Sequence, residues 1–145
     1  MIRLMTISDY EDVYALWCTT SGMGLNDIDD SREGIAKFLA RNPNTCFVAV
    51  EQRRVVGVIL GGHDGRRGYI YHMAVAVSMR ERGIGTALLD ATLNALKLEG
   101  ICKIGLVVFT RNSIGNAFWE KRGFTLREDL NYRNKAIAEL KIIET

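Results

Sequence analysis

Short apolar runs and helical stripes of apolar residues alternate along this chain. Residues 69–77 (Tyr-Ile-Tyr-His-Met-Ala-Val-Ala-Val) are rich in β-branched and aromatic side chains and follow a glycine, which predicts a buried strand. Apolar residues then recur at helical spacing as far as Gly100, with polar side chains between them, which predicts a helix over 84–99. The apolar stripe of that helix consists of Ile84, Leu88, Ala91, Ala95 and Leu98.

The same patterns predict the other elements and the class of fold. Apolar runs flank the polar segment 51–54, which predicts a β-hairpin. Strands mixed with helices and hairpins are typical of an α+β sheet that is antiparallel in large part. Because no repeat, linker or low-complexity run interrupts the pattern, residues 1–145 are interpreted as one domain. The predicted strands are 2–6, 45–51, 54–62, 68–77, 103–109, 124–128 and 134–143, and the predicted helices are 9–20, 31–41, 84–99 and 113–122.

The loop between the strand at 68–77 and the following helix has the character of an anion site. A loop that opens a helix leaves backbone N–H groups without partners, and the helix dipole adds partial positive charge there. Gly83 and Gly85 would let the backbone approach a ligand closely, and Arg80 and Arg82 supply full positive charge. The segment therefore predicts a site for a diphosphate, although a short loop of this kind is also compatible with an ordinary tight turn.

Two common phosphate loops fit this segment poorly. A Walker loop needs a Lys before its Ser or Thr, whereas Thr86 follows Gly85 directly. A Rossmann fingerprint needs a third Gly or Ala where this chain has Leu88. The segment Arg80-x-x-Gly83-x-Gly85 resembles instead the Arg/Gln-x-x-Gly-x-Gly/Ala signature of GNAT-family N-acetyltransferases, which in that family holds the pyrophosphate of acetyl-CoA.

A second segment, residues 112–124, resembles the other signature of the same family. It begins with an Asn, continues into a short helix with an aromatic pair, and closes with Gly-Phe. Asn112 or the following Ser can cap the helix, Ala117 and Phe118 are expected to pack inward, and Gly123 lets the chain turn. An ordinary capped helix is the alternative. The two motifs occur in the same order as in the family, with a predicted apolar strand between them, and this makes the resemblance specific.

The resemblance implies a fold, a cosubstrate and a set of contacts. In the family fold a mixed sheet splays after the strand that matches 68–77, and the pantetheine arm of acetyl-CoA occupies the gap. A primary amine attacks the thioester directly, and a backbone N–H of that strand stabilises the oxyanion. Met73 and Val75 are the candidates for main-chain contacts, and their side chains fit a core role as well. The implied acetyl-CoA contacts are Met73, Ala74, Val75, Val77, Arg80, Glu81, Arg82, Gly83, Ile84, Gly85, Thr86, Asn112 and Trp119.

The catalytic candidates depart from the family pattern. Many relatives carry, at the position of Trp119, a Tyr thought to protonate the leaving thiolate; an indole is no useful acid, and packing beside the pantetheine arm is the alternative role. Many relatives carry a basic Glu at the position of Tyr71. His72 is the next residue, and because successive strand residues face opposite sides we expect that both cannot face the site. Tyr132 is a further candidate proton donor, and structural roles remain the alternative for Tyr71 and His72.

In this family the first two helices and the loop between them, here residues 21–30, build the acceptor site. Acidic residues there would attract a cationic amine, and apolar neighbours would form a wall. Helix capping by Asp29 or Asp30 and a core position for Trp17 explain these residues equally well. The acceptor, a small-molecule or peptide amine, is not identified. The residues concerned are Trp17, Met23, Asp27, Asp29 and Asp30.

Composition excludes some classes of partner. The 145 residues are 48% hydrophobic, enough for one core, and no apolar stretch approaches the length of a membrane span. A net charge of +2 gives no general case for nucleic acid. We expect a cytoplasmic protein without a nucleic-acid or membrane partner, and a homodimer is left open.

The three cysteines, Cys18, Cys46 and Cys102, are scattered in apolar surroundings and show no metal-binding spacing. They are interpreted as buried reduced thiols, and no metal site is predicted. A catalytic cysteine is the alternative.

Two functions from different classes follow. The first is an N-acetyltransferase. The second is an acyl-CoA-binding sensor or scaffold without turnover, which the missing Tyr and the missing strand Glu keep open as the alternative. A Rossmann-like nucleotide binder is a distant third.

Overall fold

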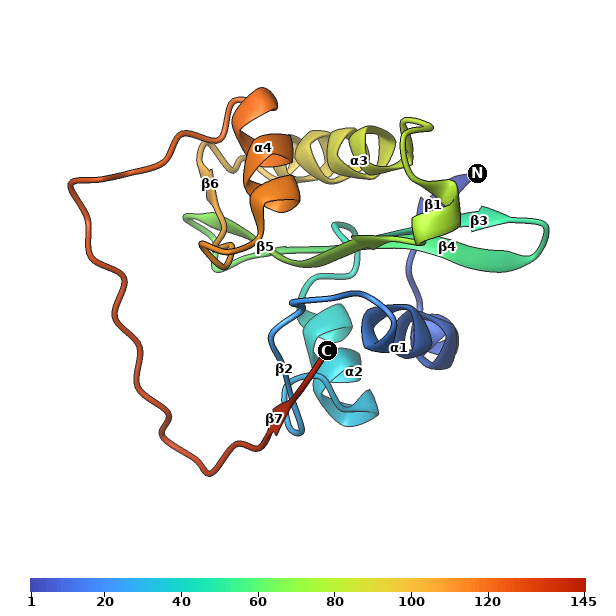
Figure 1. Ribbon diagram of the computed structural model, residues 1–145, viewed down its shortest axis with the longest axis horizontal. Coiled ribbons are helices and arrows are strands. Elements are labelled where there is room, and N and C mark those ends of the chain that lie inside the picture. Colours follow the sequence, from blue (N-terminus) through green and yellow to red (C-terminus); the bar gives the residue numbers. More distant parts are fainter.

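A five-stranded sheet forms the centre of the molecule in the computed structural model, which describes residues 1–145 (Figure 1). The strands follow the order β1-β3-β4-β5-β6. All neighbours are antiparallel except β5 and β6, which are parallel, so the predicted mixed and largely antiparallel sheet is confirmed. The strands are β1 (Ile2–Leu4), β3 (Phe47–Glu51), β4 (Arg54–His63), β5 (Gly68–Val75) and β6 (Ile104–Gly105).

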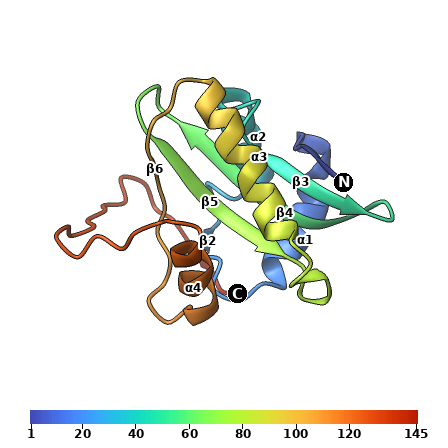
Figure 2. The ribbon, with the colours of Figure 1, turned by 90° about the horizontal axis from the view of Figure 1, so that it is seen from above.

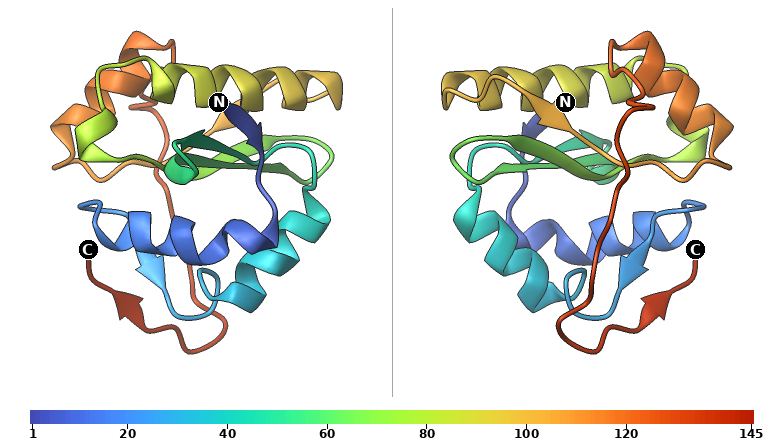
Figure 3. Two further views of the ribbon diagram at one scale, coloured as in Figure 1. Left: turned by 90° about the vertical axis from the view of Figure 1, so that its right-hand side faces the viewer. Right: turned by 90° about the vertical axis from the view of Figure 1, so that its left-hand side faces the viewer.

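Helices cover both faces of this sheet (Figure 3). Helices α1 (Tyr10–Cys18) and α2 (Arg32–Arg41) lie on one face, and α3 (Ile84–Leu98) and α4 (Ser113–Lys121) lie on the other. Each interface contains its own apolar cluster, so the sheet separates two cores. None of the four helices combines the length and apolar character that crossing a membrane requires. Two 3₁₀ turns complete the helical elements, at Ile7–Asp9 and Val77–Met79.

Helix α3 lies across β4 and β5 (Figure 2). Its buried side chains are Leu88, Leu89, Thr92 and Leu96. The predicted stripe is wrong at its end, since Leu98 is 88% exposed. At 100° per residue, position 98 points about 200° away from position 96 and so faces solvent.

The hairpin predicted at 51–54 is confirmed. Gln52 and Arg53 connect β3 to β4, with φ values of +49° and +65°. Two consecutive residues with positive φ are the geometry of a tight hairpin turn whose twist matches that of its strands.

A β-bulge interrupts β5 at His72. Leu60 pairs with Tyr71 and Val58 pairs with Ala74, so one residue of β4 faces two residues of β5. The φ of His72 is +22°. The bulge breaks the alternation of side chains, because the Tyr71 ring packs on Phe38 of α2 while the His72 ring packs on Trp17 of α1. The expectation that these two neighbours cannot share a face is therefore wrong.

The sheet splays between β5 and β6. The two strands pair only at Gly68 with Ile104 and at Tyr69 with Gly105. The rest of the predicted strand 103–109 is not a strand, and residues 70–75 of β5 have no strand partner on that edge. This is the splayed edge that the family resemblance implies.

The two predicted closing strands are wrong over most of their length. Residues 124–141, here called the C-terminal arm, leave α4 as extended chain and cross to the α1/α2 side (Figures 1 and 3). Only β7 (Ile142–Ile143) forms a strand, and it pairs with β2 (Leu25–Asn26), a short strand that the sequence did not predict. The arm pairs with no strand of the main sheet, and β2 and β7 form a separate two-stranded sheet.

Candidate functional site

The start of α3 leaves backbone amides without partners, an arrangement that can receive an anion. Gly83 is the N-cap residue, with φ +81°, and no side chain caps the helix there. By contrast, Ser31 caps α2 and Asn112 caps α4 through side-chain oxygens. The first helical hydrogen bond runs from the N–H of Ala87 to the carbonyl of Gly83, so the preceding amides remain free for a ligand.

The arginines of the loop take different positions. Arg80 donates through Nε to the carbonyl of Val75 at 3.2 Å, which ties the loop to the end of β5. Arg82 is exposed. A third cation, Arg122, donates to the hydroxyl of Thr86 from Nε at 3.1 Å and also from its terminal nitrogen, and its guanidinium lies 4.4 Å above the Phe118 ring.

Arg122 is a residue that the sequence analysis missed. It follows α4 directly, in the second family-like segment, and reaches the first turn of α3. Its place immediately before Gly123 was the available signal.

Gly85 has a packing role that differs from the predicted one. A Cβ at this position would lie 3.0 Å from Cε of Met73 and 3.4 Å from the Phe118 ring, whereas a Cβ at Gly83 would meet nothing within 4 Å. Gly85 therefore lets α3 approach β5 and α4. Gly83 faces open space, and only this glycine matches the predicted approach of a phosphate.

The remaining predicted acetyl-CoA contacts lie on β5, in the turn that follows it and at the start of α4. Met73 and Val75 pack against the α3 cluster, and Ala74 is buried among the α1/α2 cluster. Val77 lies outside the strand, in the 3₁₀ turn, and is 69% exposed. The side-chain oxygen of Asn112 accepts from the N–H of Gly115 at 2.8 Å, so the predicted cap is confirmed.

Of the other loop residues, Glu81 is exposed with φ +62°, and Ile84 and Thr86 are half-buried in the first turn of α3.

Trp119 lies half-buried on α4 between two aromatic rings. The centroids of Phe118 and Phe124 are 5.0 and 5.1 Å from its own, both in edge contact. The expectation that Ala117 packs inward is wrong, because this residue is exposed and the half-buried pair is Phe118 and Trp119. The surroundings of Trp119 match its packing role.

On the opposite face of β5 the structure brings His72 to Asp30. His72 Nε2 lies 2.6 Å from Oδ1 of Asp30, whose side chain is 4% exposed. Both helix-capping alternatives for the aspartates are wrong, since Ser31 accepts from the N–H of Gly34 at 3.0 Å and Asp29 accepts from Nδ2 of Asn26. Trp17 is fully buried in the core.

The other two residues of that loop contact the end of the chain. Asp27 accepts from the backbone N–H of Lys141 at 2.7 Å, and the N–H of Met23 donates to the Thr145 hydroxyl at 3.0 Å. These bonds hold the end of the C-terminal arm against the loop.

Tyr71 continues this face as part of an aromatic row. Its ring lies 4.6 Å from that of Tyr69 and 5.6 Å from that of Phe38, and it lines a pocket of about 330 Å³ between α2 and the start of β5. Burial, followed by the charges of Tyr132 and Asp29, raises the pKa of Tyr71. Tyr132 is 68% exposed on the C-terminal arm, with its phenol close enough to act on this row.

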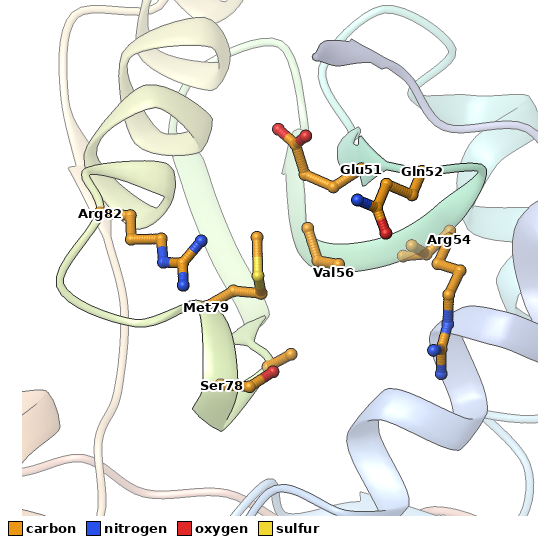
Figure 4. Close-up of a pocket in the computed structure, with 9 residues that line it drawn as sticks. Glu51, Gln52, Arg54, Val56, Ser78, Met79 and Arg82 are labelled. Atoms are coloured by element: carbon orange, nitrogen blue, oxygen red, sulfur yellow. The ribbon is translucent and has the colours of Figure 1, made fainter.

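A second pocket of about 330 Å³ lies beside the anion loop (Figure 4). The hairpin between β3 and β4 and the segment 76–82 form its walls, and Arg82 borders it. Neither Met73 nor Trp119 lines it, so this pocket is separate from the splayed edge.

The cysteines are only partly as predicted. Cys46 is buried, and burial raises its pKa to about 12. Cys18 and Cys102 are exposed, which corrects the interpretation of all three as buried. Cys18 is the last residue of α1, and Cys102 follows the turn at Gly100.

Comparison with known proteins decides the family. The model of the acetyltransferase (GNAT) family matches residues 10–124, which is most of the chain. The chain belongs to the GNAT family. The matched region contains the uncapped start of α3, the splayed edge of β5 and Trp119, so the resemblance drawn from two short segments is confirmed.

Relatives of this GNAT protein are acetyltransferases, and the similarity extends over most of their length. One from Sodalis glossinidius (strain morsitans) is 31% identical over 140 residues, covering 95% of this chain and 96% of that protein. One from Photorhabdus laumondii is 36% identical over 109 residues, covering 74% and 73%. This chain is therefore an acetyl-CoA-dependent acetyltransferase, which favours the enzyme over the sensor without turnover.

Solved structures agree on the fold. Ard1 from Thermoplasma volcanium superposes with a TM-score of 0.78 at 26% identity, covering 88% of this chain and 83% of that one. The PaiA N-acetyltransferase from Thermoplasma acidophilum, in complex with coenzyme A, gives 0.77 at 19% identity, covering 88% and 90%. The predicted GNAT fold is confirmed.

Proposed function

We propose that this acetyltransferase transfers the acetyl group of acetyl-CoA to a primary amine by direct attack within a ternary complex. The observation that carries the proposal is the unpartnered edge of β5, residues 70–75, which leads from the bulge at His72 to the anion loop. Sites for both substrates thus meet on one strand. All four helices share apolar clusters with the same sheet, which supports treating residues 1–145 as one catalytic domain.

The backbone and the loop account for cosubstrate binding. Free amides at the start of α3, with Arg80, Arg82 and Arg122 nearby, suit a diphosphate. A backbone N–H of β5 near Met73 would donate to the carbonyl oxygen as negative charge develops on it. In this proposal the N–H groups of the edge hold the thioester arm in the place of the missing strand.

The chemistry requires one bond to form and one to break. The amine nitrogen attacks the acetyl carbon, a C–N bond forms, and the C–S bond breaks with its electron pair leaving on sulfur. A thiol of pKa about 8.5 leaves adequately as the thiolate, so an acid is helpful and not essential. Trp119 then serves as packing between its aromatic neighbours, and Tyr71 or Tyr132 remains as the hydroxyl that can protonate sulfur.

The attacking amine must first lose a proton, because alkyl amines have pKa values near about 10. On the α1/α2 face the candidates are the side chains that the bulge brings together, Tyr71 and His72. Asp29 acts electrostatically on Tyr71, which makes this face suitable for a cationic acceptor.

A panel of amines tests the proposal. Polyamines, amino acids, aminoglycosides, peptides with free N-termini and lysine peptides are each incubated with acetyl-CoA, and free thiol release is measured against the rate without amine. We expect at least one class to raise the rate and to yield an N-acetyl product by mass spectrometry. Acetylation confined to hydroxyl or thiol acceptors would contradict the choice of a primary amine.

A further inference from the structure

His72 and Asp30 form a buried contact between two segments 42 residues apart. The side chains are 15% and 4% exposed, and Nε2 lies 2.6 Å from Oδ1. The other carboxylate oxygen accepts from the backbone N–H of Asn26 at 2.8 Å, and the carbonyl of Asp30 accepts from the Tyr10 hydroxyl at 2.7 Å. These two hydrogen bonds fix the position of Asp30, so that its free carboxylate oxygen points at the imidazole.

This contact decides which nitrogen of His72 carries the hydrogen. An ionised carboxylate can only accept, so Nε2 is the donor in the pair. Nδ1 makes no hydrogen bond and is accessible to solvent. A neutral imidazole with its hydrogen on Nε2 presents a lone pair on Nδ1, which is the form a general base requires.

The backbone at His72 is held in an unfavourable conformation. Its φ of +22° lies inside a strand, whereas the other non-glycine residues with positive φ, Gln52, Arg53 and Glu81, lie in turns or loops. A bulky residue with positive φ persists only when its surroundings over-determine it, and such strain clusters at functional sites. Here the bulge turns the ring to the face of Tyr71.

The surroundings enclose the pair on the core side. The fully buried Trp17 meets the His72 ring edge-on at 5.1 Å, and Tyr71 lies 6.5 Å away on the same face. The titratable groups around the pair, drawn from β5, the loop before α2 and α1, are Tyr71, Asp29, Asp30, Tyr10 and Tyr14.

We propose that Asp30 is the positioning residue of an Asp30–His72 dyad in which His72 Nδ1 accepts the proton of the attacking amine. The inference rests on the proposed function and deepens it by naming the base of that site and the group that orients it. The proton leaves the amine nitrogen for Nδ1 as the C–N bond forms. The imidazolium keeps its Nε2 hydrogen bond to Asp30, whose charge balances it, and then releases the proton to solvent.

Nitrogen-15 NMR of histidine-labelled protein tests the orientation without any substrate. The chain has only two histidines, His63 and His72, so His63→Gln assigns the spectrum. We expect neutral His72 to carry its hydrogen on Nε2. In Asp30→Asn the N–H of Asn26 should retain the amide oxygen, so the NH₂ group faces His72 and moves the hydrogen to Nδ1. Wild-type protein with the hydrogen on Nδ1 would overturn the proposal.

Kinetics test the role. With an acceptor found in the amine panel, Asp30→Asn and His72→Gln should each lower kcat by at least about 100-fold, with acceptor KM within about threefold. The acid limb of the kcat/KM profile should move to lower pH in Asp30→Asn, since the imidazolium loses its counter-charge, and should disappear in His72→Gln. Glu99→Gln is the matched control, because it removes the carboxylate 3.1 Å from His63 and should leave the rate unchanged.

The outcomes separate this inference from the proposed function. If the wild type acetylates an amine while Asp30→Asn loses only thermal stability and keeps its kcat and acid limb, the pair is a structural tie and the inference is wrong. If the wild type acetylates no amine, the proposed function fails, and the base role that rests on it falls with it. The NMR result still shows separately whether Asp30 orients His72.

Discussion

The two faces of β5 perform their tasks by different means. On the α3/α4 face, backbone amides and the splayed strand edge form the proposed cosubstrate site, with Arg80 and Arg82 in its loop and Arg122 beside it from the end of α4. On the α1/α2 face, side chains from separate segments meet, as His72 and Asp30 do, and one backbone position is strained to allow this.

The difference lies in how each face responds to substitution. A site formed by backbone is disturbed by adding atoms, whereas a site formed by side chains is disturbed by removing them. Single-atom changes such as carboxylate to amide therefore probe the α1/α2 face, and glycine substitutions probe the α3/α4 face.

The largest effect expected on the α3/α4 face comes from Gly83→Val. The added side chain occupies the open space in front of the free amides, and the positive φ costs about 1–2 kcal/mol. We expect acetyl-CoA to bind at least about 10-fold more weakly, measured by calorimetric titration.

Gly100→Val is the matched control for this change. Gly100 has φ +82°, also meets nothing within 4 Å, and lies at the other end of α3. It should lose similar thermal stability and keep its acetyl-CoA affinity. Equal loss of affinity in both variants would show that backbone strain, and not access to the amides, controls binding.

Trp119 tests whether the aromatic packing of α4 supports the same face. Trp119→Ala leaves a hole between Phe118 and Phe124, and because the site is half-buried we expect a stability loss of about 2 kcal/mol and several-fold weaker acetyl-CoA binding. Trp119→Tyr should retain most of the packing, with turnover equal to or above the wild type.

A Tyr variant that binds acetyl-CoA normally but is inactive would contradict a simple packing role. It would also show that this position does not correspond to the acid of other family members.

The contrast between the faces also explains what could be predicted from the sequence. The anion loop, the capped helix at Asn112 and the β3–β4 hairpin depend on residues adjacent in the chain, and all were predicted. The partnership of His72 with Asp30 was not, because no local pattern links positions 42 apart and a bulge removes the period-two rule used to place side chains.

The prediction for the C-terminal arm was wrong over most of its residues. A strand is predicted from the sequence over 134–143, although six of these ten residues are Asn, Lys, Ala or Glu, which are depleted in strands. Only the last two residues of that range pair, and they pair with β2, itself a two-residue element too short to leave a pattern. The prediction for Leu98 is a smaller error. Helical spacing placed this residue on the buried stripe of α3, but its side chain is exposed.

Arg122→Gln should have a moderate effect. Losing one half-buried cation beside Thr86 is worth about 1 kcal/mol, so KM for acetyl-CoA should rise about fivefold and depend less on salt. Arg111→Gln is the control, since Arg111 stacks 4.3 Å above Phe109 as Arg122 stacks 4.4 Å above Phe118. Equal KM changes in the two variants would exclude a specific role for Arg122.

The smallest effect should follow removal of all three thiols. At neutral pH the Cys46 thiol is protonated, because burial raises its pKa to about 12, and Cys18 and Cys102 are exposed at a helix end and a turn, neither of which supplies the positive charge that activates a thiolate. A triple Cys→Ala protein should keep its acetylation rate within about threefold, allowing for lost packing at Cys46.

Direct attack also predicts initial-velocity lines that intersect when acetyl-CoA and amine are varied together. A covalent relay through one thiol would give parallel lines, and a single Cys→Ala change would then abolish transfer in a folded protein. Detection by mass spectrometry of an acetylated cysteine that passes its acetyl group on to the product would contradict the direct mechanism. The α1/α2 face would then need no base for the amine in the first half-reaction, because the thiol and not the amine would attack the thioester.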